Sequence, residues 1–411
     1  MYIKEEIREL ALQAEKEISP VFEVIDEIAL FNQEKVLNAF INNKVSEACL
    51  NATTGYGYGD IGRETLDKIY AEVFDCEKAL VRHNIVSGTH CLAIALFSVL
   101  RPGDTLLAAT GKPYDSLEEV IGISGENNGS LKEFGVNYKQ VDLIDNDVDY
   151  DGIKKALTND VKAVILQRSK GYDWRDTFSS EKIGEIISFI KSIKKDVICI
   201  VDNCYGEFTE KYEPTHYGAD LIVGSLIKNP GGSLAQTGGY IAGKECYVDL
   251  AAYRQTAPGI GGECGASLNQ NRFMYQGFFM APHIVAQAKK SAVFCSYLMQ
   301  KLGYEVNPLP DGDRFDIIQA IKFNDKDKLI KFIQAIQAAS PVDSYVTPMP
   351  WAMPGYQHDV IMAAGTFVSG ASIEISADAP IKKPYVGYLQ GGVTYESARL
   401  AIMNAASSLV D

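Results

Sequence analysis

Residues 198–232 read ICIVDNCYGEFTEKYEPTHYGADLIVGSLIKNPGG, and two short apolar runs at this point of the chain decide the fold. The first, VICIV, is closed by Asp202, and the second, ADLIVGSLI, is closed by Lys228. Runs of this length that are rich in Val and Ile and bounded by Gly, Asn and Pro are typical of buried strands. Because ligands of open α/β sheets bind at the carboxyl ends of the strands, we expect Asp202 and Lys228 to project into one cleft.

A carboxylate and an amine held together in such a cleft are the groups that pyridoxal phosphate (PLP) chemistry requires. The lysine forms a Schiff base with the cofactor aldehyde, and the acid keeps the pyridine nitrogen protonated. Asp202 and Lys228 could equally form a structural ion pair, and these two residues alone do not decide between the two interpretations. Ser225–Lys228 also matches the S-x-x-K pattern of serine acyl-transfer enzymes, but its companions S-D-N and K-T-G do not occur in the chain.

The composition is that of an ordinary globular protein of 411 residues, and its formal net charge of −14 argues against nucleic acid or an anionic membrane surface as a partner. The N-terminal segment MYIKEEIREL has no apolar core of a signal peptide, and no apolar stretch approaches the length of a membrane span. Eight cysteines and five histidines show no zinc-binding spacing, so the sequence predicts no metal site. Scattered cysteines in apolar contexts indicate reduced thiols and a cytoplasmic protein.

The alternation of apolar segments predicts three parts. Residues 1–50 have the helical periodicity of an amphipathic N-terminal arm. Residues 51–295 alternate strands and helices, which indicates βαβ units and a mostly parallel sheet in a large domain. Residues 296–411 have the texture of a smaller α+β domain that includes a strand at SIEISAD, residues 372–378. A long helical pattern near this boundary is expected to be interrupted around Pro282.

Two glycine-containing segments point to ligand binding. Ser87-Gly88-Thr89 lies between an apolar strand and an apolar helix, where backbone N–H groups and the helix dipole favour a phosphate; an ordinary helix N-cap is the alternative. Gly57, Gly59 and Gly62 satisfy G-x-G-x-x-G, but NATT before them is no apolar strand, so a dinucleotide site is not favoured. This segment instead suggests a loop that lays aromatic and cationic side chains over a ligand.

Several blocks in one order resemble the methionine γ-lyase-like family, sometimes labelled aluminium-resistance proteins, within the cysteine/methionine metabolism group of PLP-dependent enzymes. The blocks are GYGYGDIGRETL, VSGTHCLAIAL, GKPYDSLEEVIGI, QRSKGYDWR, SLIKNPGG and QGGVTYESA. The resemblance implies the aspartate aminotransferase-like fold type I, which combines a mostly parallel seven-stranded sheet with a smaller α+β C-terminal domain.

The resemblance also assigns residues to the cofactor. Lys228 matches the catalytic Schiff-base lysine and Asp202 the partner of the pyridine nitrogen, while Ser225 is similar to the hydroxyl that binds the phosphate beside Ser87, Gly88 and Thr89. Tyr58 matches a tyrosine that reaches the phosphate of a neighbouring subunit. The arginine expected two positions later is replaced by Asp60, and Arg63 could take its place. The family's ring-stacking tyrosine corresponds to Thr110, which leaves His90 or Tyr114 to cover the ring.

The small domain departs from the pattern of these lyases. They carry an arginine in the strand equivalent to SIEISAD to bind the substrate carboxylate, whereas this strand contains no arginine and has Glu374 near that position. We expect the substrate carboxylate to be bound by another arginine of the chain, with Arg168 and Arg254 as the principal candidates beside Arg175 and Arg272.

These expectations add up to a PLP-dependent carbon–sulfur lyase that acts on a small sulfur amino acid such as cystathionine or methionine. Lys228 would remove the Cα proton, and a thiol would leave from Cβ or Cγ. A PLP-dependent aldolase or aminotransferase of the same fold is an alternative, as is a non-catalytic PLP-binding stress-response protein. A Tyr58 loop that completes another subunit's site implies a homo-oligomer, at least a dimer and plausibly a tetramer.

Overall fold

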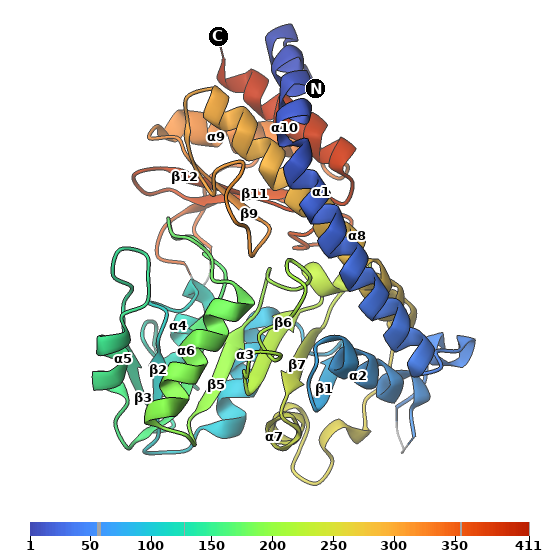
Figure 1. Cartoon of the computed structure of the whole chain (residues 1–411), viewed down its shortest axis with the longest axis vertical. Helices are drawn as coiled ribbons and strands as arrows, with labels where there is room; N and C mark the ends of the chain where they lie inside the picture. Colours follow the sequence, from blue (N-terminus) through green and yellow to red (C-terminus); the bar gives the residue numbers. More distant parts are fainter. Residues whose placement is uncertain (56–58, 127, 354–355, 411) are drawn as a thin grey trace.

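A computed structural model describes the chain except residues 56–58, 127, 354–355 and 411. A sheet of seven buried or half-buried strands forms its larger part (Figure 1). The strands are β1 (Lys78–Arg82), β2 (Thr105–Ala108), β3 (Asn137–Gln140), β4 (Val161–Gln167), β5 (Ile198–Asp202), β6 (Leu221–Ser225) and β7 (Gly239–Gly243).

The order of these strands is β1-β7-β6-β5-β4-β2-β3. Strands β3, β2, β4, β5 and β6 run parallel, and β7 is antiparallel to both β6 and β1. The two apolar runs of the decisive segment are the adjacent strands β5 and β6, with Asp202 opposite Val223 in the register. The predicted mostly parallel seven-stranded sheet is therefore confirmed.

Helices cover both faces of this sheet, as a doubly wound sheet of apolar strands requires. One face packs against α3 (Gly88–Val99), α4 (Asp115–Ile121) and α7 (Glu245–Gln255). The other face packs against α2 (Ile61–Val73), α5 (Tyr150–Ala156), α6 (Ser180–Ile193) and part of α8 (Asn271–Lys301). Serine hydroxyls cap two of these helices, since Ser87 accepts a hydrogen bond from His90 N and Ser179 accepts one from Lys182 N.

The C-terminal part of the chain is built on a five-stranded antiparallel sheet of order β10-β11-β12-β9-β8. Its elements are β8 (Glu305–Asn307), β9 (Ile318–Lys322), α9 (Lys326–Gln337), β10 (Val360–Ala363), β11 (Ser376–Pro380), β12 (Val386–Gln390) and α10 (Tyr395–Leu409). The strand predicted at residues 372–378 begins later, at Ser376, because Glu374 turns back to bind the amides of Phe367 and Val368.

Two long helices join the two sheets. Helix α1 (Glu5–Asn42) runs beside α8 from the small sheet down to the level of α2 (Figure 1). Both contribute apolar residues to the core of the large sheet and to that of the small sheet. The expected interruption at Pro282 is wrong, because α8 continues through this buried proline. The predicted domain boundary at 295/296 falls inside α8, and the division into three parts stays a prediction.

Three short 3₁₀ helices complete the described elements: η1 (Glu47–Leu50), η2 (Asn229–Gly231) and η3 (Gly261–Glu263). Within the part of the chain that the structure covers, no helix combines the length and the apolar character needed to cross a membrane.

Candidate active site

A cavity of about 370 Å³ lies where the parallel strands end and the small domain covers the large one. Strands β4, β5 and β6 and the beginning of α3 form its floor, and Met353, Tyr356 and residues 362–378 of the small domain form its cover. Seven of the predicted cofactor-binding residues meet here: Ser87, Gly88, Thr89, Tyr114, Asp202, Ser225 and Lys228. The lining residues on which the argument depends are Ser87, Gly88, Thr89, Tyr114, Gln167, Tyr172, Asp202, Tyr205, Ser225, Lys228, Tyr356, Ser376 and Asp378.

Asp202 and Lys228 both line the cavity, as the ends of two adjacent strands predict. Asp202 is the last residue of β5, and its Oδ1 accepts a hydrogen bond from Cys204 N at 3.1 Å. Burial raises the pKa of Asp202, and the charge of Lys228 only partly offsets this effect. Burial alone would lower the pKa of Lys228, but the surrounding acidic groups, including Asp202, outweigh it and raise that pKa. The two side chains thus form an electrostatically coupled pair in one cavity.

Tyr205 is a contact of this lysine that the sequence reasoning missed. Lys228 Nζ lies 4.0 Å from the centroid of the Tyr205 ring, within the range of a cation–π interaction. Tyr205 has a φ of 71°, a left-handed conformation that few residues other than glycine adopt. The side chain of Asn229, the neighbour of Lys228, holds it in place by donating to Tyr205 O at 2.9 Å. Tyr205 belongs to no recognised motif, but its position just beyond the carboxyl end of β5 was a signal that the sequence offered.

The start of α3 forms the polar end of the cavity. Ser87, Gly88 and Thr89 lie beside Ser225, and a Cβ on Gly88 would come within 3.6 Å of Ser225 Cβ. The Ser225 hydroxyl is buried and has no hydrogen-bond partner among the described residues. A buried hydroxyl of this kind at a helix N-terminus fits an absent anionic group, because it can donate a hydrogen bond that the fold leaves unused.

Three tyrosine rings stand at another side of the cavity: Tyr114, Tyr172 and Tyr356, here called the tyrosine cluster. The Tyr172 centroid lies 5.8 Å from that of Tyr114 and 5.9 Å from that of Tyr356. Of the two predicted ring-stacking residues, Tyr114 lines the cavity. The His90 ring instead accepts a hydrogen bond from Val86 N through Nδ1 at 3.2 Å, which is a local contact at the start of α3.

Asp378 of β11 brings a second carboxylate into the cavity, and no sequence motif announced it. It is 8% exposed, and its Oδ1 accepts a hydrogen bond from Gln390 Nε2 at 3.1 Å. Burial raises the pKa of Asp378 to about 7. Glu374, which stands near the position of the lyases' arginine, accepts backbone hydrogen bonds and does not line the cavity.

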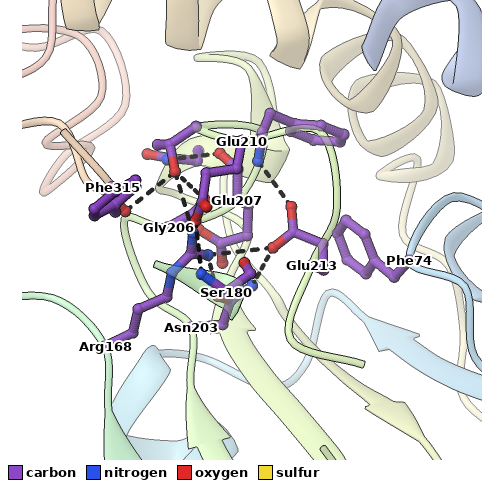
Figure 2. A network of polar contacts seen from close by, with 12 residues as sticks. Phe74, Arg168, Ser180, Asn203, Gly206, Glu207, Glu210, Glu213 and Phe315 are labelled. Carbon is purple, nitrogen blue, oxygen red and sulfur yellow. Dashed lines mark hydrogen bonds and ion pairs between the residues drawn. The ribbon is translucent and has the colours of Figure 1, made fainter. Parts of the chain in front are cut away.

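Arg168 follows β4, does not line the cavity and lies in a polar network (Figure 2). Its guanidinium donates to Asn203 Oδ1 at 2.8 Å and forms ion pairs with Glu210 and Glu213. The side chain is fully buried, so these protein groups occupy the donors that the predicted substrate role would use. The network fixes residues 203–213, the segment from which Tyr205 reaches the cavity lining.

The other predicted arginines also lie outside the cavity lining. Arg254 is exposed near the opposite end of the sheet, with its guanidinium 5.0 Å from the Phe97 ring centroid. Arg175 is buried and donates to Gln167 O and Ser169 O behind the cavity wall, and Arg272 is exposed on α8. The substrate roles of Arg168 and Arg254 therefore find no support in the arrangement of this chain.

Arg63 and Tyr58 were predicted to serve a neighbouring chain. Arg63 does not line the cavity of its own chain; Nη2 donates to Glu263 O at 2.9 Å, while Nε and Nη1 are buried without a described partner. Asp60, which stands where an arginine was expected, caps α2 by accepting a hydrogen bond from Arg63 N. Tyr58 lies outside the described residues, so its predicted role stays a prediction.

The fold is that of the PLP-dependent enzymes of fold type I. The PLP-dependent protein YhfS of Escherichia coli shares the fold, with a TM-score of 0.63 over 94% of this chain and 97% of that chain at 13% identity. Among the described residues, the lysine–carboxylate pair and the unpartnered Ser225 hydroxyl beside the start of α3 fit the amine, ring-nitrogen and phosphate contacts of PLP.

The chain belongs to the methionine gamma-lyase family, because residues 7–410 match the sequence model of that family. It is 53% identical over 406 residues to the uncharacterized protein YnbB of Bacillus subtilis (strain 168), covering 98% of this chain and 96% of YnbB. The chain is thus a member of a family of PLP-dependent lyases, as the resemblance implied.

Two solved structures are similar over nearly their whole length. A protein from Clostridium novyi NT, named carbon-sulfur lyase involved in aluminum resistance, has a TM-score of 0.95 at 52% identity, covering 99% of this chain and 97% of its own. A protein from Listeria monocytogenes str. 4b F2365, proposed by its name to be a cystathionine beta-lyase involved in aluminum resistance, has a TM-score of 0.96 at 53% identity, covering 98% and 100%.

Proposed function

We propose that this protein is a PLP-dependent carbon–sulfur lyase that acts on a sulfur amino acid of the cystathionine or methionine type. The observation that carries the proposal is the meeting of Lys228, Asp202 and the start of α3 in one cavity. Membership of the methionine gamma-lyase family supports the reaction class. When bound, PLP supplies an aldehyde for an amine and a ring that withdraws electrons from Cα.

We assign cavity residues to three parts of the cofactor: the aldehyde, the ring nitrogen and the phosphate. Lys228 holds the aldehyde end, and Asp202 faces the ring nitrogen and keeps a proton on it. Ser225, Gly88 and Thr89 take the phosphate, with Ser87 capping the helix behind them. Tyr114 is the described aromatic candidate for the ring face, since the His90 ring is engaged by Val86 N.

Within this assignment Lys228 Nζ exchanges the proton of the substrate Cα, because it is the sole amine among the described residues that line the cavity. Burial alone would lower the pKa of Lys228, but Cys204, Tyr205 and then Asp202 raise it. Pairing of Asp202 with a cationic ring nitrogen removes one source of that shift and favours the neutral amine. In a β-elimination the Cα–H electron pair would form a carbon–carbon double bond while the sulfur leaves with the C–S electrons and takes up a proton as a thiol. Water would then convert the released enamine to a 2-oxo acid and ammonia.

The site is proposed to be shared between subunits. Arg63 has two buried nitrogens without a described partner, and Tyr58 belongs to the preceding glycine-containing loop. Phenol and guanidinium groups both donate hydrogen bonds to phosphate oxygens. A neighbouring chain that receives these groups at its phosphate would make the active form a dimer at least.

A substrate panel tests the reaction. The holoenzyme is incubated with cystathionine, methionine and threonine, and thiol, 2-oxo acid, ammonia and aldehyde are measured. Release of a thiol together with equal amounts of 2-oxo acid and ammonia supports a lyase. Aldehyde from threonine would indicate an aldolase, and turnover of none of these compounds by the loaded protein would contradict an enzymatic role on this substrate class.

A further inference from the structure

The cavity has an unusual charge balance for a site that binds amino acids. Among the described residues that line it, Lys228 is the single cation, whereas Asp202 and Asp378 are carboxylates. Nearby cations face other partners: Arg175 donates to backbone carbonyls, and Lys170 donates to Asn307 O at 3.1 Å. The proposed function assigns Lys228 and Asp202 to the cofactor, which leaves Asp378 without an assigned partner.

Asp378 is a costly group to leave unpaired. It is 8% exposed, and the side chains that donate hydrogen bonds to it are neutral: the amide of Gln390 at 3.1 Å and the hydroxyl of Tyr172. A buried carboxylate without a cation is destabilising unless a ligand supplies the charge or the group takes up a proton. Lys228 is the lysine that lowers the pKa of Asp378, and its engagement by the cofactor would remove that influence.

The tyrosine cluster adds a second, independent feature. Its three rings line the same cavity, and the Tyr114 and Tyr356 planes meet at 87° with centroids 6.4 Å apart. The Ser376 hydroxyl, which also lines the cavity, is buried without a hydrogen-bond partner in the described chain. Aromatic faces attract cations, and an ammonium group also donates hydrogen bonds to such hydroxyls.

We infer that the cavity takes a sulfur amino acid whose sulfur substituent carries an ammonium group, with Asp378 as its counter-ion and the tyrosine cluster around it. This inference rests on the proposed lyase function and names its substrate class. Met353 and Met362, which also line the cavity, provide apolar contacts for the methylene groups between sulfur and nitrogen.

Three ligands of similar size test the inference on the holoenzyme. S-(2-aminoethyl)-L-cysteine carries the cation, S-propyl-L-cysteine is its neutral isostere, and S-carboxymethyl-L-cysteine carries an anion. Binding is followed by the change in cofactor absorption and by calorimetry. We expect the cationic ligand to bind at least about tenfold tighter than the other two, as a charge-assisted hydrogen bond and a cation–π contact would give.

Asp378→Asn should remove this preference, weakening the cationic ligand about tenfold while the affinity for the neutral ligand stays within about twofold. Asp359→Asn is the matched control, because Asp359 is an exposed carboxylate of the same domain that does not line the cavity. Tyr356→Leu provides a second variant that should reduce the preference by removing one ring.

The outcomes separate the inference from the proposed function. The inference is overturned if the unaltered holoenzyme binds the neutral or the anionic ligand as tightly as the cationic ligand, or more tightly; this outcome does not depend on whether the variants fold. It is also overturned if Asp378→Asn keeps the preference for the cationic ligand. An equal fall in turnover of all three ligands with unchanged affinities would show that Asp378 acts in the chemistry and also overturns it. A preference for the cationic ligand without thiol release would refute the proposed lyase function and support the cation-binding site. Thiol release without this preference would support the lyase function and refute the cation-binding site.

Discussion

Replacing Arg168 with methionine distinguishes a structural role from the predicted substrate role of this residue. Arg168 is completely buried: its side chain has 0% exposure, and that of its partner Glu213 has 1%. Methionine fills much of the same volume but leaves the Glu213 carboxylate buried without its cation and Asn203 Oδ1 without its donor. Breaking a buried ion pair in this way typically costs about 3–5 kcal/mol of unfolding free energy.

The assay is chemical denaturation followed by near-ultraviolet circular dichroism, with cofactor retention measured in parallel. We expect Arg168→Met to lose about 3–5 kcal/mol and to bind PLP more weakly, because the Arg168 network holds the segment that carries Tyr205. The control is Arg254→Met, since Arg254 is exposed and loses a cation–π contact worth about 0.5–1 kcal/mol. A stable Arg168→Met protein with normal PLP retention and a raised KM would refute this reasoning and restore the substrate role.

Four further outcomes are expected, three from the candidate site and one from the buried carboxyl group of Glu207. Lys228→Ala should keep the fold and lose the borohydride-stable link to PLP, and mapping that link to another lysine would contradict the assignment. Asp202→Asn should retain PLP but lower kcat by at least about 10²-fold, measured with whichever substrate the panel identifies. Burial raises the pKa of Glu207 to about 8, so the folded state holds a proton that the unfolded state releases at lower pH. Stability should therefore fall between about pH 5 and 8, and Glu207→Gln should reduce this fall in denaturation curves while the exposed control Glu23→Gln leaves it unchanged. Mixing Tyr58→Phe with Lys228→Ala protein under subunit exchange should restore activity above the average of the parents, and no gain in proven hybrids would place the Tyr58 contact within its own chain.

The main elements of the fold could be predicted because apolar runs and strand-end polar residues are local signals. β5 and β6 follow from their Val- and Ile-rich sequences, and the meeting of Asp202 with Lys228 follows from the parallel order of these strands. The helix through Pro282 could not be predicted by the same means. Its continuity depends on burial between two cores, which a local rule about proline does not include.

The predicted substrate role of Arg168 finds no support, and the sequence itself contained the signal against it. Side chains alternate along a strand, so neighbouring residues at the end of β4 point to opposite sides. Gln167 and Ser169 line the cavity, and Arg168 between them points into the network with Glu210 and Glu213. This period of two was an available signal. Asp378 had no such signal, because its approach to Lys228 depends on the packing of the small domain over the large one.

Charge balance argues that the cavity of one chain is incomplete on its own. A PLP phosphate carries roughly two negative charges, and an amino-acid substrate adds a carboxylate to those of Asp202 and Asp378. Against these stand Lys228, the substrate ammonium groups and the N-terminus of α3, which is equivalent to roughly half a positive charge. Arg63 has buried nitrogens without described partners and lies outside its own chain's cavity. A second subunit that supplies such a guanidinium would provide the missing positive charge, which is the physical reason to expect that catalysis requires an oligomer.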